Sequence, residues 1–282
     1  MTRRFLIIYL VVAVFICLVG VGNIMMPMAA HVSEFSLYAP DTSDPGTPQD
    51  QGLPDMKAIK VKTADGDMVA WFQPPRANNR KVIIFFAGNA ETLAGQAYMS
   101  KDLLSHGYGV YLCTYPGYGL NPGKPSEEAL YETARSGIRW LQEQGYPQED
   151  IILLGASLGA GVAVQMGLEF TPDIVVLVSS FTDIPEVLAY RHVELPKSML
   201  EKERYDNLSK IKRVKARLLF VHGENDTLIP IANARKLYEA ANEPKEFMIV
   251  KGSDHNELYS HGAGDMLMEW LDKQVNEKNE QH

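Results

Sequence analysis

The stretch Gly155-Ala156-Ser157-Leu158-Gly159 lies between an apolar run and a segment with helical spacing. Residues 151–154 before it form a short apolar run that is typical of a buried strand. Residues 160–170 after it carry apolar side chains at helical spacing. A Gly-x-Ser-x-Gly turn between a strand and a helix is the setting of a nucleophile elbow, which presents a serine hydroxyl at the edge of a sheet. Because such a turn is strained, we expect the flanking positions to need very small side chains.

Strands and helices alternate through most of the remaining sequence. A loose alternation of apolar residues and lysines predicts a strand at 56–63. Further strands are predicted at 68–73, 81–86, 108–114, 151–154, 174–178, 217–222 and 247–251. Helices are predicted at 91–106, 127–144, 160–170, 231–241 and 263–275. Asp65-Gly66 predicts a hairpin turn between the first two strands. This alternation is typical of an α/β fold with a mostly parallel central sheet and helices on both faces.

The first thirty residues are set apart by their apolar character. Residues 5–22 follow Arg3 and Arg4 and carry no charge, and a helix of this length spans a bilayer core of about 30 Å. We expect a transmembrane signal anchor at residues 1–30. A cleaved signal peptide is the alternative, but the run is long for one and Met28 makes the cleavage site poor. The arginines predict a cytoplasmic N-terminus, with the rest of the chain on the non-cytoplasmic side of the membrane.

The remaining chain divides into a linker and one catalytic domain. Residues 31–55 contain four prolines among polar residues and are predicted to be a Pro-rich linker. Residues 56–282 are long enough for a single α/β domain with a large core. Within it, residues 181–211 have a mixed, partly helical pattern and are predicted to form a small cap over the catalytic edge of the sheet.

Composition excludes several classes of function. The formal net charge is −8, and no cluster of lysines and arginines follows the apolar segment, so nucleic acid is not an expected partner. No Cys/His spacing resembles a metal site, and no cofactor is predicted. Cys17 lies in the apolar N-terminal segment, so a structural disulfide with Cys113 is not expected.

A serine hydroxyl is a weak nucleophile at neutral pH and needs a general base. In a parallel sheet this base comes from a loop at the carboxyl edge of the strands. His255 fits because it follows the last predicted strand. His261, which opens the last helix, is the nearest alternative. His222 also ends a strand, but we expect it to support the loop that follows it.

A third residue has to orient the imidazole and stabilise its cation. Asp226 is the best candidate because it lies in the loop after the strand that precedes the last one. Glu224 is a weaker alternative, and Asp254 is poorly placed to reach the ring of its neighbour His255. Asp226 has a second possible role as the cap of the helix that follows it. The chain order Ser157, Asp226, His255 is the one expected of α/β-hydrolases.

The oxyanion of an acyl-transfer intermediate needs two backbone donors. One is the N–H of Leu158, directly after the nucleophile. The other is expected in the loop after the strand at 81–86, where the N–H of Asn89 is the best candidate. Gly88 beside it permits a close approach of the backbone. An ordinary strand-to-helix loop is the alternative interpretation.

Several short motifs occur with these candidate residues. They are Gly88-Asn89-Ala90, Tyr115-Pro116-Gly117-Tyr118-Gly119, Gly123-Lys124-Pro125-Ser126, Gly155–Gly159, Ser179-Ser180-Phe181-Thr182-Asp183, Tyr205 with Asn207, and the loops of Asp226 and His255. Over residues 56–276 this combination resembles the Bem46/ABHD13-like branch of the α/β-hydrolase superfamily. The resemblance implies a serine hydrolase that acts on acyl esters or thioesters, and such proteins often carry an N-terminal membrane segment. Ala87 departs from the family pattern, which has a histidine there.

Together these residues predict a membrane-anchored serine hydrolase. Ser157 attacks an acyl carbonyl, His255 transfers the proton, Asp226 orients His255, and water releases the acyl-enzyme without a cofactor. The expected partners are a small-molecule or lipid acyl substrate and, through the N-terminal helix, the membrane. The sequence makes no prediction of an oligomer. Two alternatives remain: a catalytically impaired binding or scaffold protein, and a peptidase on the same fold.

Overall fold

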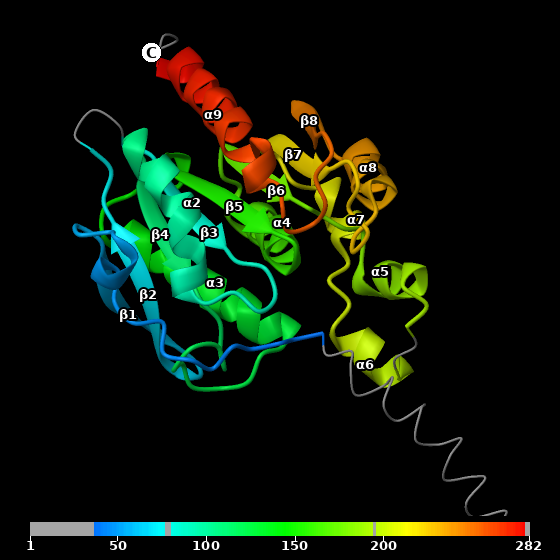
Figure 1. The fold of residues 1–282 in the computed structure, drawn as a ribbon, viewed down its shortest axis with the longest axis horizontal. Helices are drawn as coiled ribbons and strands as arrows, with labels where there is room; N and C mark the ends of the chain where they lie inside the picture. Colours follow the sequence, from blue (N-terminus) through cyan, green and yellow to red (C-terminus); the bar gives the residue numbers. More distant parts are fainter. Residues whose placement is uncertain (1–36, 77–79, 194–195, 280–282) are drawn as a thin grey trace, which may run out of the picture.

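The computed structural model describes residues 37–76, 80–193 and 196–279 (Figure 1). The predicted anchor at 1–30 lies outside these residues, and so do residues 31–36 of the predicted linker. Within 37–76, 80–193 and 196–279, no helix is both long enough and apolar enough to span a bilayer.

One eight-stranded sheet organises the domain. Its order is β1-β2-β4-β3-β5-β6-β7-β8. The strands are β1 Lys57–Thr63, β2 Gly66–Gln73, β3 Val82–Phe86, β4 Gly109–Cys113, β5 Ile151–Ala156, β6 Ile174–Val178, β7 Arg217–Gly223 and β8 Lys245–Val250. Strand β2 runs antiparallel to both β1 and β4, and every other neighbouring pair is parallel. The mostly parallel sheet predicted from the alternating pattern is therefore confirmed.

The hairpin between β1 and β2 turns one residue earlier than the sequence predicts. Thr63 pairs with Gly66, so the two loop residues are Ala64 and Asp65 instead of Asp65 and Gly66. Gly66 begins the second strand with a φ of 120°, a conformation that residues with a side chain rarely adopt. Strand β1 is an outer strand of the sheet, and its lysines Lys57, Lys60 and Lys62 are exposed.

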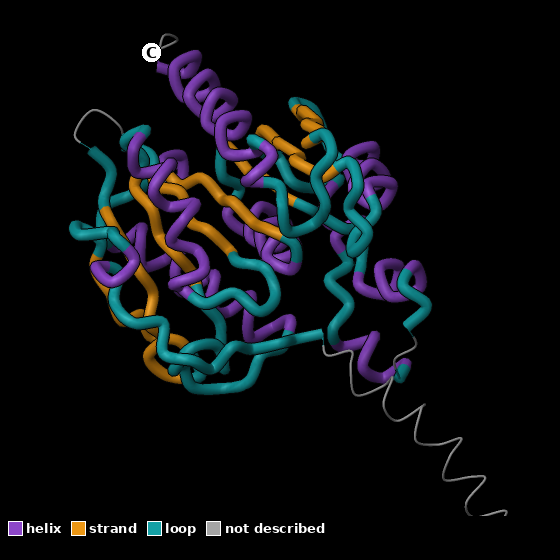
Figure 2. The backbone as a smooth tube through the Cα atoms, viewed as in Figure 1, coloured by secondary structure: helices purple, strands orange, loops and turns teal. Residues whose placement is uncertain are grey.

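Helices cover both faces of the sheet (Figure 2). The α-helices are α2 Leu93–Ser105, α3 Glu127–Glu143, α4 Leu158–Phe170, α5 Ile184–Tyr190, α6 Lys197–Lys202, α7 Asn207–Ile211, α8 Ile231–Ala240 and α9 Ala263–Asn279. The described residues also include the short 3-10 helices η1 Gln49–Gln51, η2 Gln148–Asp150 and η3 Tyr259–His261. Helices α2 and α9 contact each other on one face, whereas α3, α4, α7 and α8 form a connected layer on the other.

The core lies around the central strands. Every residue of β3 and β4 is buried, and so are the first five residues of β5. Strands buried on both faces require continuous apolar sequence, which explains why these three segments show runs instead of alternation. Because β3, β5, β7 and β8 are parallel, the loops that carry the predicted site residues all leave the same edge of the sheet.

Two further segments border that edge. Helices α5, α6 and α7 lie within residues 181–211, and α5 and α6 stand beside the sheet at the lower right of Figure 1. Residues 37–55, which belong to the predicted linker, run along the domain. There the carbonyl of Asp41 accepts a hydrogen bond from the N–H of Gly119 at 2.7 Å, and Leu53 is buried.

Candidate active site

Ser157 lies in the sharp turn between β5 and α4. Its backbone has φ 52° and ψ −118°, a conformation that a residue with a side chain adopts only when its surroundings enforce it. The N–H of Ser157 donates to the carbonyl of Val178 at 2.9 Å, which ties the turn to the end of β6. The predicted strand–turn–helix setting of Ser157 is thus present in the structure.

The glycines on either side of the serine have no room for a side chain. A Cβ atom on Gly155 would lie 2.2 Å from the carbonyl oxygen of Gly159. A Cβ atom on Gly159 would lie 2.0 Å from the carbonyl oxygen of Phe86 in β3. The expectation of very small side chains at both positions is confirmed, and the reason is that α4 crosses the backbones of β5 and β3 at contact distance.

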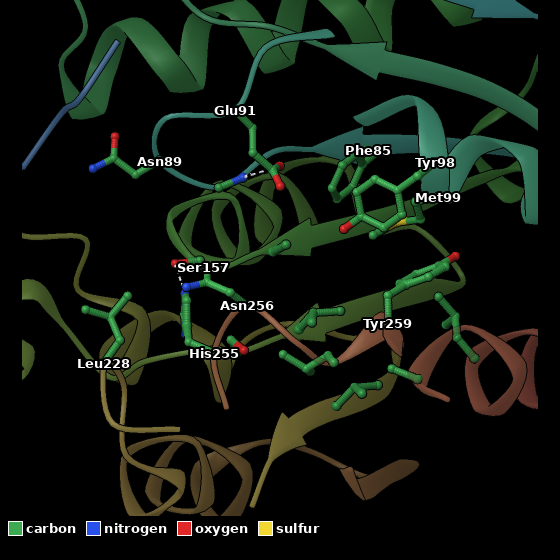
Figure 3. A pocket seen from close by; sticks show the side chains of 18 residues that line it. Phe85, Asn89, Glu91, Tyr98, Met99, Ser157, Leu228, His255, Asn256 and Tyr259 are labelled. Carbon is green, nitrogen blue, oxygen red and sulfur yellow. Dashed lines mark hydrogen bonds between the residues drawn. The ribbon is translucent and has the colours of Figure 1, made fainter. Parts of the chain in front are cut away.

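Three loops bring the predicted triad residues together. The Nε2 atom of His255, in the loop after β8, lies 3.0 Å from the Oγ atom of Ser157 (Figure 3). The Nδ1 atom of His255 lies 2.7 Å from Oδ2 of Asp226, in the loop after β7. This arrangement leaves Nε2 facing the serine hydroxyl and Nδ1 facing the carboxylate, which is the geometry of a nucleophile, a base and an orienting acid.

Asp226 is held by its own loop as well as by His255. Its Oδ1 atom accepts hydrogen bonds from the N–H groups of Leu228 at 2.9 Å and Ile229 at 2.7 Å. Burial alone would raise the pKa of Asp226, but the hydrogen bonds from His255 and Ile229 and the charge of the imidazole lower it overall. The carboxylate therefore stays ionised at neutral pH. The alternative role as a helix cap is not seen, because α8 (Ile231–Ala240) begins after Pro230 without a side-chain cap. Oδ1 of Asp226 instead holds its own loop, while Oδ2 faces His255.

The residues that the sequence leaves as alternatives have other partners. The carboxylate of Glu224 accepts from the N–H of Gly252 at 2.9 Å. Asp254 accepts from the N–H of Asn256 at 2.9 Å, and Nδ1 of His261 lies 2.9 Å from a carbonyl of its own turn. None of the three belongs to the hydrogen-bonded series around Ser157.

His222 supports the Asp226 loop, as predicted. Its Nε2 atom lies 2.8 Å from the carbonyl oxygen of Ile229 and 3.4 Å from Oδ2 of Asp226. Burial lowers the pKa of His222, although the Ile229 carbonyl and the Asp226 charge oppose this effect. A neutral His222 with its proton on Nε2 donates to the Ile229 carbonyl and leaves the Asp226 carboxylate to His255.

The predicted oxyanion loop lies directly beside the nucleophile. A Cβ atom on Gly88 would be 3.5 Å from Cβ of Ser157. Neither the N–H of Asn89 nor that of Leu158 has an acceptor within the described part of the chain. Ala87, which replaces the histidine expected from the resemblance, is fully buried, and its carbonyl accepts from the hydroxyl of Tyr115 at 3.1 Å.

Two cavities meet at Ser157. The first, which we call the α2 cavity, has a volume of about 230 Å³ and is lined by Phe85, Glu91, Tyr98, Met99 and Tyr259, among others. The second, which we call the α5 cavity, has a volume of about 210 Å³ and is lined by Leu37, Ile184, Val187, Leu188 and Arg191, among others. Both are also lined by Asn89, Ser157 and Leu228. The lining of the α5 cavity is mostly apolar, whereas that of the α2 cavity also includes Glu91, His255 and Asn256.

Glu91 is a site residue that the sequence reasoning missed. It follows the oxyanion loop, and its carboxylate accepts from the N–H of Gly88 at 3.3 Å (Figure 3). Burial raises the pKa of Glu91, opposed by the Gly88 hydrogen bond and the charge of His255. The signal in the sequence is an acidic residue just after a predicted oxyanion loop, but a solvated first-turn carboxylate gives the same pattern.

In the described ranges no group of three or more His, Cys, Asp or Glu side chains is arranged to hold a metal ion.

The chain is similar to a known protein family and to several known proteins. A family model described as serine aminopeptidase, S33, matches residues 77–203. An uncharacterised protein of Mycobacterium tuberculosis is 34% identical over 208 residues, which are 73% of this chain and 74% of that protein. The lysophosphatidylserine lipase ABHD12 of Macaca fascicularis is 28% identical over 214 residues, which are 69% of this chain and 54% of that protein. The chain therefore spans about half the length of this lipase.

Solved structures show the same architecture. The esterase Pf2001 of Pyrococcus furiosus superposes with a TM-score of 0.69 at 20% identity, covering 84% of this chain and 98% of that one. An esterase domain from Rhodothermus marinus gives a TM-score of 0.60, also at 20% identity, over 77% of this chain and 98% of that domain. At this level of identity the likeness demonstrates a shared fold.

We predict that Gly155→Ala and Gly159→Ala each destabilise the domain by about 3 kcal/mol or more, because the new methyl group has to displace backbone atoms. Chemical denaturation followed by circular dichroism measures this. Gly95→Ala is the matched control: it lies in the first turn of α2, where a Cβ atom meets nothing closer than 3.9 Å. It should change stability by less than about 1 kcal/mol, in the stabilising direction. Equal stability of Gly159→Ala and Gly95→Ala would contradict the close crossing.

We also predict a pH-dependent effect of Glu91→Gln. Because burial raises the pKa of Glu91, ionising it costs folding free energy above its unfolded pKa of about 4.3, and the full cost is reached once the pH exceeds its folded pKa. The variant keeps an oxygen acceptor for Gly88 but cannot ionise. Its melting temperature relative to the wild type should therefore rise as the pH is raised above about 4. A difference that stays constant over this range would show that Glu91 titrates normally.

Proposed function

Because the chain belongs to the α/β-hydrolase superfamily, we propose that it is a serine hydrolase that cleaves an acyl ester or thioester through a Ser-His-Asp triad. The α/β-hydrolase fold predicted from the sequence is confirmed by the esterase neighbours, and the lipase and esterase relatives support a hydrolase. The observation that carries the triad is the hydrogen-bonded series from Ser157 through His255 to Asp226, at the point where the two cavities meet.

The proposed reaction has two halves. Ser157 Oγ attacks the acyl carbonyl carbon and its proton moves to Nε2 of His255, while Asp226 stabilises the imidazolium. The N–H groups of Leu158 and Asn89 stabilise the oxyanion of the tetrahedral intermediate. His255 then gives its proton to the leaving oxygen or sulfur, which leaves an acyl-Ser157 ester. A water molecule, deprotonated by His255, attacks this ester, releases the carboxylic acid and restores the serine hydroxyl.

The substrate class and the location belong to the same proposal. The motifs of the Bem46/ABHD13-like branch and the similarity to a lysophosphatidylserine lipase support an acyl substrate of lipid type. The uncharged run after Arg3 and Arg4 supports an anchor at residues 1–30, with a cytoplasmic N-terminus and the catalytic domain on the non-cytoplasmic side. Residues 31–55 would then connect the anchor to the domain at 56–282.

A peptidase is the second candidate, because the matching family model is described as a serine aminopeptidase. It would use the same triad and oxyanion donors on an amide, so fold and site do not separate the two. Parallel assays of acyl esters, thioesters and aminoacyl amides distinguish an esterase from a peptidase. Hydrolysis of the amides with little turnover of the esters would favour the peptidase.

Replacement of the nucleophile tests the triad. We expect Ser157→Ala to lower ester turnover by about 10⁴-fold or more, and Asp226→Asn by about 10³- to 10⁴-fold through loss of the correct imidazole orientation. A fluorophosphonate probe should label the wild type and spare Ser157→Ala. Unchanged melting temperatures control for folding.

Equal labelling of the wild type and Ser157→Ala would assign the nucleophile to another residue. A folded wild-type protein that neither reacts with the probe nor hydrolyses any acyl substrate would favour the binding or scaffold alternative.

The anchor is tested by fractionation. We expect the mature protein to retain its first thirty residues, to remain with membranes after carbonate washing, and to be protected from protease added on the cytoplasmic side. A soluble mature form that begins near His31 would instead identify the segment as a cleaved signal peptide.

A further inference from the structure

We infer that the segment Leu37–Ala39 contributes to the active site in two ways. It positions the oxyanion loop through the side chain of Asn89, and it forms a wall of the α5 cavity. This inference rests on the proposed hydrolase function and adds a positioning element from outside the predicted catalytic domain at 56–282.

The side-chain amide of Asn89 makes three hydrogen bonds on the side away from the nucleophile. Its Nδ2 group donates to the carbonyl of Leu37 at 2.7 Å. Its Oδ1 atom accepts from the N–H of Ala39 at 2.8 Å and from the hydroxyl of Tyr118 at 2.8 Å. Figure 3 shows the amide group of Asn89 pointing away from Ser157. Two of the three hydrogen bonds therefore come from the segment, and one comes from the loop after β4.

These contacts fix the orientation of a proposed oxyanion donor. The side chain and the N–H of Asn89 share one Cα atom, so restraining the amide restrains the direction of the N–H. The next residue, Ala90, has a φ of 70°, a conformation that needs support from its surroundings. Oxyanion donors contribute only when they are held near their working geometry, and a displacement of about 1 Å can cost about 100-fold in rate.

The segment is itself attached to the domain at several points. The hydroxyl of Tyr38 lies 2.9 Å from that of Tyr205, and it also donates to the carboxylate of Glu203. Tyr205 is fully buried and follows the residues of α6. Further along, the carbonyl of Asp41 accepts from the N–H of Gly119. The segment thus bridges the end of the predicted cap and the oxyanion loop, and it is held well enough to position Asn89.

Leu37 gives the segment a second role. It lines the α5 cavity together with Val187 and Leu188 of α5, in the cavity that also reaches Ser157. A substrate group that enters this cavity contacts Leu37. Loss of the Leu37 side chain should therefore weaken binding, whereas loss of the Asn89 contacts should slow the chemical steps.

The experiment uses three variants of the full chain with p-nitrophenyl butyrate as substrate. Ala39→Pro removes the N–H that donates to Asn89, at an exposed position where only the backbone is engaged. We expect its kcat to fall about 10- to 100-fold with KM nearly unchanged. Leu37→Ala should raise KM by about fivefold with kcat retained, because one apolar wall of the cavity is lost. Thr42→Pro places a proline in the same exposed stretch, outside Leu37–Ala39, and should retain wild-type kcat and KM.

Melting temperatures of all three variants separate positioning from unfolding. The inference is overturned if the wild type turns over the ester and Ala39→Pro matches it in kcat. It is also overturned if Ala39→Pro and Thr42→Pro lose activity equally, in step with their melting temperatures. Should Ala39→Pro not fold, an unchanged KM in Leu37→Ala overturns the inference. A wild type that is inert toward both the ester and a fluorophosphonate overturns the proposed function as well, so the two failures are distinguishable.

Discussion

The crossing of helix α4 over strands β5 and β3 constrains everything else in the site. At Gly155 and Gly159 the backbones approach so closely that a single methyl group would overlap a carbonyl oxygen. This approach forces the chain to reverse within one residue, which is why Ser157 adopts a positive φ. Burial on both sides of the sheet and the hydrogen bond from Ser157 to the end of β6 hold the serine in this strained conformation. A looser crossing would let the serine relax and its hydroxyl leave the edge of the sheet.

The parallel sheet then assembles the chemistry from separate loops. The loops after β3, β5, β7 and β8 each contribute one element: a donor loop, a nucleophile, a carboxylate and an imidazole. Each loop is fixed by contacts of its own, such as the Leu228 and Ile229 N–H groups on Asp226 and the Tyr115 hydroxyl on the carbonyl of Ala87. The positions of the site atoms therefore depend on these supporting contacts as much as on the strands.

Local sequence patterns were sufficient to predict the strands, the turn around Ser157 and the order of the loops that carry the triad residues. Apolar runs and turn residues are encoded within short stretches, and Asp226 could be preferred over Asp254 because a residue adjacent to His255 cannot reach its ring. The turn between β1 and β2 lies one residue earlier than the predicted Asp65-Gly66, because strand pairing decides where a hairpin closes. Glu91 was not predicted because a solvated carboxylate in a first helical turn has the same local pattern, although its partner Gly88 is only three residues away. The role of the Asn89 side chain was not predicted because its partners are set by the fold: Leu37 and Tyr118 are distant in sequence from Asn89. Such contacts have no signature in a local window.

The exposed lysines of β1 have a consequence beyond the site. An outer strand presents unpaired N–H and carbonyl groups to solution, and a strand of another molecule can extend the sheet there. Lys57, Lys60 and Lys62 are spread along this strand, so an incoming strand would bring its backbone up to three positive charges. These lysines therefore protect the outer strand against edge-to-edge association, a protection that the central strands do not need because they are paired on both sides.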